Sequence, residues 1–159
     1  MTKNAVLVVG ATGGLGSAVV RALSEAGLLA VFTGRRREAL DRLAAEVPGS
    51  IARSLDAADG VAAEELIAEI DGRHGLTAYV HLAGGFAMGP AIDRLTAQDW
   101  EAMFEMNWVG LRNGASAAFG RFRAGGGGSI VTVASLAALT GGAAMAPYAV
   151  SKAAVVAFT

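Results

Sequence analysis

The stretch that decides the fold is Ala5–Gly16, which reads AVLVVGATGGLG. Its first five residues are apolar without alternation, which is typical of a strand buried on both faces of a parallel sheet. Gly10, Gly14 and Gly16 follow, where the chain has to turn tightly, bring bare backbone close to a ligand and let the next helix pack against the strand. The sequence therefore predicts a strand, a glycine-rich turn and a helix in direct succession.

The helix after this turn predicts an anion site. We expect it to begin near Gly14 or Leu15, so that its unpaired N–H groups and the positive end of its dipole face the turn and can hold a pyrophosphate group. The G-x-x-x-G-x-G spacing is one residue wider at the front than the general dinucleotide-binding pattern, and a single such turn is weak evidence. The alternative is an ordinary strand-to-helix connection in a chain that has 22 glycines.

Length and composition narrow the class of protein. The chain has 159 residues, enough for one domain over residues 1–159, and 53% of them are hydrophobic. The net charge of −1 does not favour nucleic acid as a partner, and no apolar run is long enough to cross a membrane. The absence of cysteine excludes disulfides, thiolate metal sites and a cysteine nucleophile. The first strand follows Met1 too closely to leave room for a signal peptide, so we expect a cytoplasmic protein.

Strands and helices are predicted to alternate along the first half of the chain. Short apolar runs end at glycine or aspartate, and the segments between them repeat apolar residues every three or four positions. This alternation predicts parallel β-α-β units, hence an open α/β sheet that binds ligands at the carboxyl ends of its strands. Ala83-Gly84-Gly85 falls at the same edge as the first glycine turn. The expected strands are Ala5–Val9, Leu28–Thr33, Ile51–Leu55 and Thr77–Leu82.

The second half of the chain is predicted to hold a long helix and a fifth strand. Thr96, with Asp99 three positions on, matches an N-cap pattern. The helix that follows is expected to bend at Asn107 and to end at the glycines 125–128. The later segments are expected to be a strand at Ser129–Ala134, a loop of small residues at Leu136–Ala146 and a helix that begins at Pro147.

Tyr148 and Lys152 are the candidate chemical pair. They are four residues apart, so on a helix they share one face, one turn apart. A nearby ammonium favours the phenolate form of a tyrosine and makes it useful as a general acid–base. Most Tyr-x-x-x-Lys pairs have no such role, but this pair follows the fifth strand directly. Ser135, at the end of that strand, can hydrogen-bond the substrate oxygen that the tyrosine would protonate.

At this point the chain resembles the short-chain dehydrogenase/reductase family, in the subgroup of the 3-oxoacyl carrier-protein reductases. The resemblance extends over essentially all of the chain. It implies a Rossmann-like doubly wound parallel sheet, a nicotinamide cofactor and reversible hydride transfer between that cofactor and a carbonyl or alcohol substrate. The residues that carry it are Gly10-Ala-Thr-Gly-Gly-Leu-Gly16, Asp56, Ala83-Gly84, Asn107, Ser135 and Tyr148-Ala-Val-Ser-Lys152.

The resemblance also implies a role for each matching residue. Tyr148 would be the general acid–base, and Lys152 would stabilise its phenolate and bind the nicotinamide ribose. Ser135 would polarise the substrate carbonyl, and Asn107 would hold a helix bend and a water molecule of a proton relay. Asp56 would contact the adenine ring. The residues expected to bind the cofactor are Gly10, Thr12, Gly14, Leu15, Gly16, Arg35, Arg36, Asp56, Ala83, Gly84, Tyr148 and Lys152.

Arg35 and Arg36 favour NADP(H) as the cofactor, with NAD(H) as the other possibility. Dehydrogenases that prefer NAD place an acid at the end of the second strand, where this chain has Gly34. An arginine pair binds the 2′-phosphate that an acid would repel. The alternative is that these arginines only begin a solvated helix face.

Two features depart from the family pattern. Leu82 stands where the family has asparagine, so we expect the end of the fourth strand to be looser or braced differently, with cofactor binding kept by Ala83 and Gly84. The chain also ends at Thr159, inside an apolar run, where the family continues well beyond. We therefore expect a piece of a longer enzyme, with a sheet that is incomplete on its C-terminal side and a fifth strand with an exposed edge.

A non-catalytic dinucleotide-binding or scaffold domain is the rival interpretation, and a dehydratase or epimerase is possible on the same fold. We expect no metal site, no nucleic acid or membrane partner and, from the resemblance, a homodimer or homotetramer. We expect His81 to be packed or hydrogen-bonded rather than catalytic. The side chains expected to line an apolar substrate side are Phe86, Met88, Leu136, Leu139 and Met145.

Overall fold

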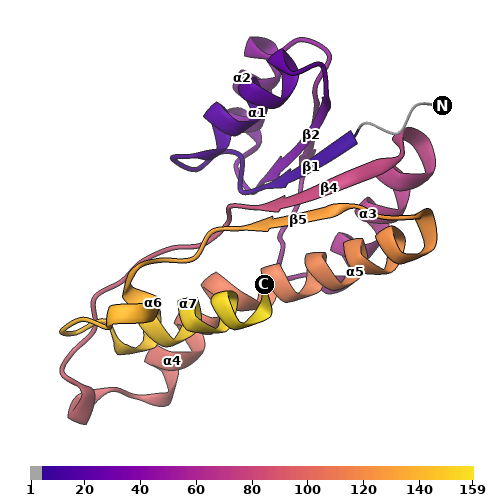
Figure 1. Cartoon of the computed structure of the whole chain (residues 1–159). Helices are drawn as coiled ribbons and strands as arrows, with labels where there is room; N and C mark the ends of the chain where they lie inside the picture. Colours follow the sequence, from indigo (N-terminus) through magenta and orange to yellow (C-terminus); the bar gives the residue numbers. More distant parts are fainter. Residues whose placement is uncertain (1–4) are drawn as a thin grey trace.

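The computed structural model describes residues 5–159. Five parallel strands form one sheet in the order β3-β2-β1-β4-β5, so the order reverses between β1 and β4 (Figure 1). The strands are β1 (Ala5–Val9), β2 (Leu29–Gly34), β3 (Ile51–Ser54), β4 (Leu76–His81) and β5 (Ser129–Thr132). The helices are α1 (Gly16–Glu25), α2 (Arg37–Glu46), α3 (Gly60–His74), α4 (Ala97–Phe104), α5 (Gly110–Gly125), α6 (Ala137–Thr140) and α7 (Ala146–Phe158), with a 3₁₀ turn η1 (Ile92–Arg94) and a π-helical turn η2 (Glu105–Val109).

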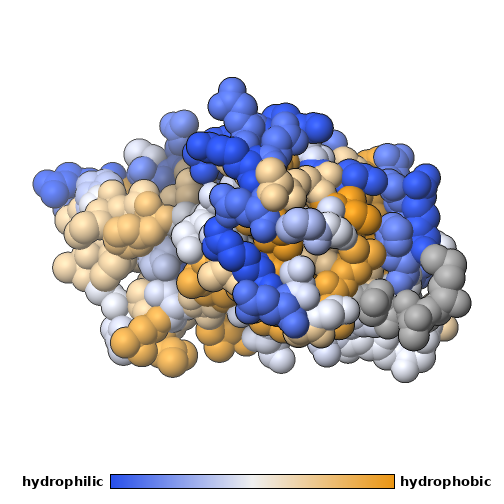
Figure 2. Space-filling view, turned by 90° about the horizontal axis from the view of Figure 1, so that it is seen from above, coloured by the Kyte–Doolittle hydropathy of each residue, from blue (hydrophilic) through white to orange (hydrophobic). Residues whose placement is uncertain are grey.

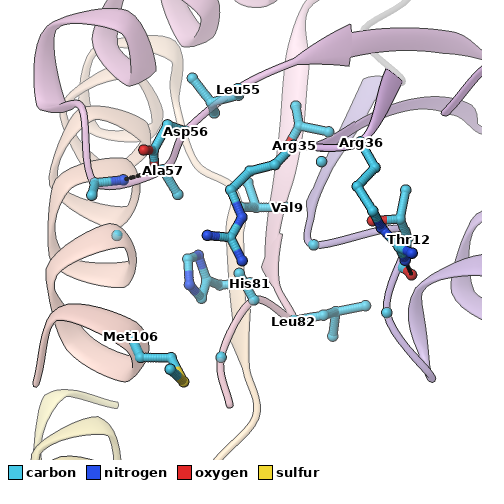
Figure 3. A pocket seen from close by; sticks show the side chains of 18 of the residues that line it. Val9, Thr12, Arg35, Arg36, Leu55, Asp56, Ala57, His81, Leu82 and Met106 are labelled. Carbon is cyan, nitrogen blue, oxygen red and sulfur yellow. Dashed lines mark hydrogen bonds between the residues drawn. The ribbon is translucent and has the colours of Figure 1, made fainter. Parts of the chain in front are cut away.

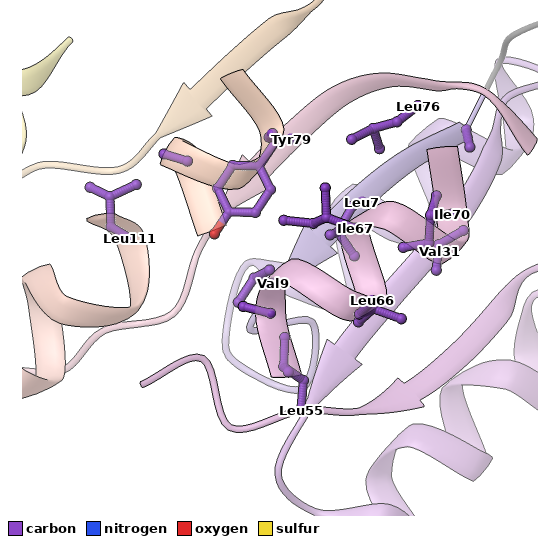
Figure 4. Packing of buried hydrophobic residues seen from close by; sticks show 14 of the residues in the cluster. Leu7, Val9, Val31, Leu55, Leu66, Ile67, Ile70, Leu76, Tyr79 and Leu111 are labelled. Carbon is purple, nitrogen blue, oxygen red and sulfur yellow. The ribbon is translucent and has the colours of Figure 1, made fainter. Parts of the chain in front are cut away.

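Helices cover both faces of the sheet. In Figure 1, α1 and α2 lie on one side of the strands, and α3 and α5 lie on the other. The β-strand side chains alternate between two buried clusters accordingly: Val8 and Phe32 pack with α1 and α2, whereas Leu7 and Val31 pack with α3 and α5 (Figure 4). All five residues of β1 are buried, as its unbroken apolar sequence predicts. The doubly wound α/β fold is therefore confirmed.

Most predicted boundaries agree with the structure to within two residues, and one prediction is wrong. The helix α1 begins at Gly16, just after the predicted start near Gly14 or Leu15. The segment Leu136–Ala146 is not a continuous loop, because α6 occupies its first half. The segment is rich in alanine and leucine, which favour helix. The Ser135 hydroxyl also accepts a hydrogen bond from the N–H of Ala137, which orders the turn into α6.

The helix expected after Thr96 is interrupted at Asn107, where the bend was expected. Thr96 and Asp99 form a reciprocal capping box, and these hydrogen bonds lower the pKa of the Asp99 carboxyl. The π-helical turn η2, which contains Asn107, separates α4 from α5. At the other side of the sheet, β5 is an edge strand with Val131 48% exposed, which agrees with the expected exposed edge. Among residues 5–159, the helices are too short or too polar to span a bilayer.

Candidate active site

A pocket of about 1050 Å³ opens at the carboxyl ends of the strands. It lies where the strand order reverses between β1 and β4, which is the usual ligand position in an open α/β sheet. Figure 3 shows side chains from β1, β4 and the segments after β2 and β3 converging on it. The sequence-predicted residues in its lining are Gly10, Thr12, Arg35, Arg36, Asp56, Ala83 and Gly84.

The glycine turn after β1 is closely packed against the end of β4. Gly10 has φ +87°, and a Cβ there would lie 2.5 Å from the nitrogen of Ala83. A Cβ at Gly16 would collide with the backbone of Ala11. The N–H groups of Gly10 and Ala11 both donate to the carbonyl of Thr33, at 3.1 and 2.9 Å. Only glycine therefore fits at these two turn positions, and the turn is held against both neighbouring strands.

The N-terminus of α1 offers unpaired donors beside the pocket. Within residues 5–159, the backbone N–H groups of Thr12, Gly14 and Leu15 have no hydrogen-bond acceptor. Gly14 and Leu15 are exposed and lie outside the pocket lining, whereas Gly16 is buried at the first position of the helix. Free N–H groups at the positive end of a helix dipole suit a phosphate group.

The end of β2 brings two arginines to the pocket. Arg36 donates from Nη2 to the carbonyl of Thr12 at 3.2 Å, so it also braces the glycine turn. Figure 3 shows the Arg35 side chain extended across the pocket and the Arg36 side chain directed at Thr12. Gly34, the last residue of β2, contributes no acid, and a Cβ there would crowd the Thr12 side chain at 2.9 Å. This edge of the pocket is therefore positively charged.

Asp56 follows β3 and lines the same side of the pocket. Its Oδ1 accepts a hydrogen bond of 3.1 Å from the N–H of Ala58, which orders the turn into α3 (Figure 3). The other oxygen of the carboxylate is left for a ligand or solvent. Across residues 5–159, no three His, Cys, Asp or Glu side chains come together as metal ligands.

Asn107 links three segments that are distant in sequence. Its Oδ1 accepts from the N–H of Gly85 at 3.0 Å, and its Nδ2 donates to Met103 O and Ser151 Oγ, both at 3.2 Å. The side chain is 1% exposed, so these three hydrogen bonds form without competition from water. The segment after β4 is thus braced by Asn107 of η2. Leu82, which stands where the family has asparagine, does not supply this brace.

The Lys152 side chain extends from α7 toward Gly84, close to Asn107. Its Nζ donates to the carbonyl of Val133 at 2.9 Å, which ties α7 to the segment that carries Ser135. A Cβ at Gly84 would lie 3.3 Å from Lys152 Nζ and 2.8 Å from Asn107 Oδ1, so only glycine leaves room for both side chains. Lys152 is 7% exposed, and burial lowers the pKa of its ammonium.

Tyr148 and Ser135 lie on the elements next to Lys152. Both are half-buried, and Tyr148 packs edge-on against Phe86, with ring centroids 4.9 Å apart. The backbone carbonyl of Tyr148 accepts from Ser151 Oγ at 2.8 Å, which connects it to Asn107. None of the four candidate catalytic residues lines the large pocket itself; Asn107 and Lys152 adjoin it at Gly84.

The expected apolar substrate side is found on the surface rather than in the pocket. Phe86, Met88, Leu136 and Leu139 are 55 to 74% exposed and do not line it. Figure 2 shows hydrophobic residues at the end of the molecule where α6 and the loop after β4 lie. The N–H of Gly89 donates to Ala144 O at 2.8 Å, so this loop is joined to the segment before α7. These side chains therefore form an open apolar surface beside Tyr148.

Sequence reasoning missed a buried pair on β4. The Tyr79 hydroxyl lies 2.8 Å from His81 Nδ1, and His81 lines the pocket. Burial raises the pKa of Tyr79, and burial together with the charge of Lys152 lowers the pKa of His81 to about 4. The expectation that His81 is packed and hydrogen-bonded is confirmed. The two-residue spacing of Tyr79 and His81 could have predicted the pair, because it places both side chains on one face of a strand.

Comparison with known proteins identifies the family. A family model described as short chain dehydrogenase matches residues 4–159. The 2,3-dihydro-2,3-dihydroxybenzoate dehydrogenase of Bacillus subtilis is 35% identical over 157 residues, which cover 96% of this chain and 60% of that protein. A crystal structure of a short-chain dehydrogenase from Streptomyces avermitilis is 31% identical with a TM-score of 0.89, covering 99% of this chain and 58% of the other. That of the F189W actinorhodin polyketide ketoreductase with NADPH is 29% identical with a TM-score of 0.90, covering 99% and 62%.

The chain covers only part of these relatives and spans about 60% of their length. The pocket at the strand-order reversal, the glycine turn and the α/β topology all agree with the match. The chain belongs to the short-chain dehydrogenase family of oxidoreductases.

Proposed function

We propose that this chain is the cofactor-binding and catalytic part of an NADP(H)-dependent oxidoreductase that interconverts a carbonyl and an alcohol. The observation that carries the proposal is the pocket itself. Its lining combines a glycine turn that admits bare backbone, two arginines at the end of β2 and a carboxylate after β3. Asn107 and Lys152 meet at Gly84 on its border.

The residues present fit a dinucleotide. The unpaired N–H groups of Thr12, Gly14 and Leu15 would hold the pyrophosphate. Arg35 would bind a 2′-phosphate, because its guanidinium extends into the pocket and β2 ends at Gly34 rather than at an acid that would repel that phosphate. Asp56 would accept a hydrogen bond from the adenine. The NADPH in the polyketide ketoreductase structure supports the same choice of cofactor.

The candidate catalytic side chains supply proton transfer and orientation. When bound, the nicotinamide supplies or accepts the hydride. Tyr148 gives a proton to the substrate oxygen in reduction and takes it back in oxidation. The Lys152 ammonium, held by Val133 O, stabilises the phenolate that remains. Ser135 donates a hydrogen bond from its hydroxyl to the same substrate oxygen, since that oxygen carries the developing negative charge.

Several finer properties belong to the proposal. The substrate is a small carbonyl or alcohol compound, and the apolar surface around Phe86 and Leu136 favours one with an apolar portion. The similarity to a polyketide ketoreductase supports the subgroup of 3-oxoacyl carrier-protein reductases. We also propose a homodimer or homotetramer in the cytoplasm.

A turnover assay tests the proposal. NADPH consumption is followed with a panel of ketones and 3-oxoacyl thioesters, and the variant Tyr148→Phe is compared with the wild type. General acid–base catalysis contributes about 10²–10⁴-fold, so we expect the rate to fall by at least ~10²-fold while the variant still binds NADPH. NADPH binding without turnover of any substrate in the panel would contradict the proposal and favour a non-catalytic dinucleotide-binding domain.

A further inference from the structure

Two side chains on β4 form a polar pair that the proposed chemistry does not use. Tyr79 and His81 are two residues apart, so both project from the face of β4 that packs against α5. Tyr79 is 1% exposed and His81 is 4% exposed. His81 lines the pocket in Figure 3, whereas Tyr79 lies in the core beside Leu111 in Figure 4. The pair thus connects the core to the pocket.

The surroundings of Tyr79 decide which nitrogen of His81 carries the proton. Within residues 5–159 the Tyr79 hydroxyl has no hydrogen-bond partner besides His81 Nδ1, and a Cβ at Gly114 would collide with its oxygen. If the phenol accepted a hydrogen bond from Nδ1, its own buried O–H would lack an acceptor, which is costly. Tyr79 therefore donates to Nδ1. A neutral imidazole then carries its proton on Nε2.

His81 is neutral in this position. Burial lowers the pKa of its imidazole to about 4, and the positive charge of Lys152 acts in the same direction. Because Nδ1 is engaged with Tyr79, the Nε2–H is the polar group that the ring can offer to the pocket. The pair is thus built to present one neutral donor at the end of β4.

We propose that His81 Nε2–H donates a hydrogen bond to an oxygen of the nicotinamide half of the bound dinucleotide, with Tyr79 as the positioning residue that fixes its tautomer. The strand order indicates which half of the dinucleotide His81 meets. The two arginines follow β2 and Asp56 follows β3, so the adenosine half lies at the β2–β3 end of the sheet. His81 and Lys152 lie at the β4 end. A neutral donor there suits a ribose hydroxyl or the carboxamide oxygen. The inference rests on the proposed function, because it needs a dinucleotide in this pocket.

Nitrogen-15 NMR of the histidine rings tests the inference directly. The chain has only two histidines, so His74, at the end of α3, serves as the internal reference. We expect the His81 ring to carry its proton on Nε2 in the free protein. Saturating NADPH should shift that resonance, whereas 2′,5′-ADP, which lacks the nicotinamide half, should shift the amides of the glycine turn and leave the His81 resonance unchanged. Neither probe should move His74.

The outcomes separate this inference from the proposed function. If NADPH shifts the glycine-turn amides and leaves His81 unchanged, or if the proton lies on Nδ1, the inference is wrong and the proposed function stands. If NADPH shifts neither group, the proposed function fails and the inference fails with it. If 2′,5′-ADP shifts His81 as NADPH does, the contact is to the adenosine half and the inference is wrong.

The variant Tyr79→Phe tests the positioning role. It keeps the ring and removes the hydroxyl, so His81 should populate both tautomers and NADPH should bind about 3- to 10-fold more weakly, the effect of one net hydrogen bond. Affinity for 2′,5′-ADP should stay unchanged. The control His74→Gln should alter neither affinity. A folded Tyr79→Phe protein with wild-type NADPH affinity and its proton still on Nε2 would overturn the inference.

Discussion

Replacement of Gly114 by alanine tests the packing that holds the pocket's β4 wall. Gly114 lies in the middle of α5 and is buried against the Tyr79 ring. A methyl group there would collide with the Tyr79 hydroxyl and lie 2.6 Å from the carbon that bears it, so the ring must move away from α5. Overpacking of this kind costs about 1–3 kcal/mol, and the better helix propensity of alanine returns about 1 kcal/mol. Loss of the Tyr79–His81 hydrogen bond adds about 1 kcal/mol. We expect a net loss of about 2 kcal/mol in the free energy of unfolding.

The same helix offers a matched control. Gly120 is also in α5, but it is exposed and nothing lies within 4 Å of a Cβ built on it. Gly120→Ala should therefore stabilise the protein by up to about 1 kcal/mol, since only helix propensity changes. Urea denaturation measures both variants. If Gly114→Ala is as stable as Gly120→Ala, the helix does not pack on Tyr79 as described and the reasoning is refuted.

The remaining predictions concern Asn107 and His81. Asn107→Ala leaves the Gly85 N–H without its partner and removes the hydrogen bond that the Ser151 hydroxyl accepts, so thermal or urea unfolding should show a loss of about 1–3 kcal/mol; a loss below about 0.5 kcal/mol would contradict the brace. The pKa of His81, about 4 when folded against an ordinary 6.5, means that the unfolded chain takes up the proton first as the pH falls. The stability due to neutral His81 is therefore present above pH 6.5 and lost between 6.5 and about 4, by up to about 3 kcal/mol. Urea denaturation at neutral pH and at about pH 4.5 measures the stability difference between wild type and His81→Gln. This difference should shrink at the lower pH; a difference independent of pH would contradict the lowered pKa of His81.

The local parts of the fold could be predicted from the sequence because their signals are local. The unbroken apolar run of β1, the glycines after it and the Thr96–Asp99 spacing each specify a structure within a few residues. The same reasoning failed at Leu136–Ala146, since small residues there suggest a loop, whereas alanine and leucine also favour helix.

In the candidate site too, residues set by local sequence could be predicted, whereas contacts between distant segments could not. Gly10 and Asp56 could be placed at the pocket because each directly follows a predicted strand, and Arg36 because it lies three residues after one. The brace from Asn107 to Gly85 joins residues 22 apart, and the bond from Lys152 to Val133 joins residues 19 apart. Such contacts depend on how α7 and η2 pack together, which no periodicity reveals. The positions of Tyr148 and Ser135 relative to a substrate stay a prediction.

The most direct test of the central claim, that this pocket binds NADP(H) through the arginines after β2, is a comparison of NADPH and NADH affinities by calorimetric titration. The wild-type chain should bind NADPH at least ~10-fold more tightly than NADH, because a charge-assisted bond to the 2′-phosphate contributes about 1.5–3 kcal/mol. Arg35→Ala should remove most of that preference and leave NADH affinity within about threefold. Arg37→Ala, whose guanidinium pairs with Asp41 on the α2 surface, is the matched control and should change neither affinity. Equal affinity for the two cofactors in the wild type, or an Arg35→Ala variant with its NADPH preference intact, would contradict the claim.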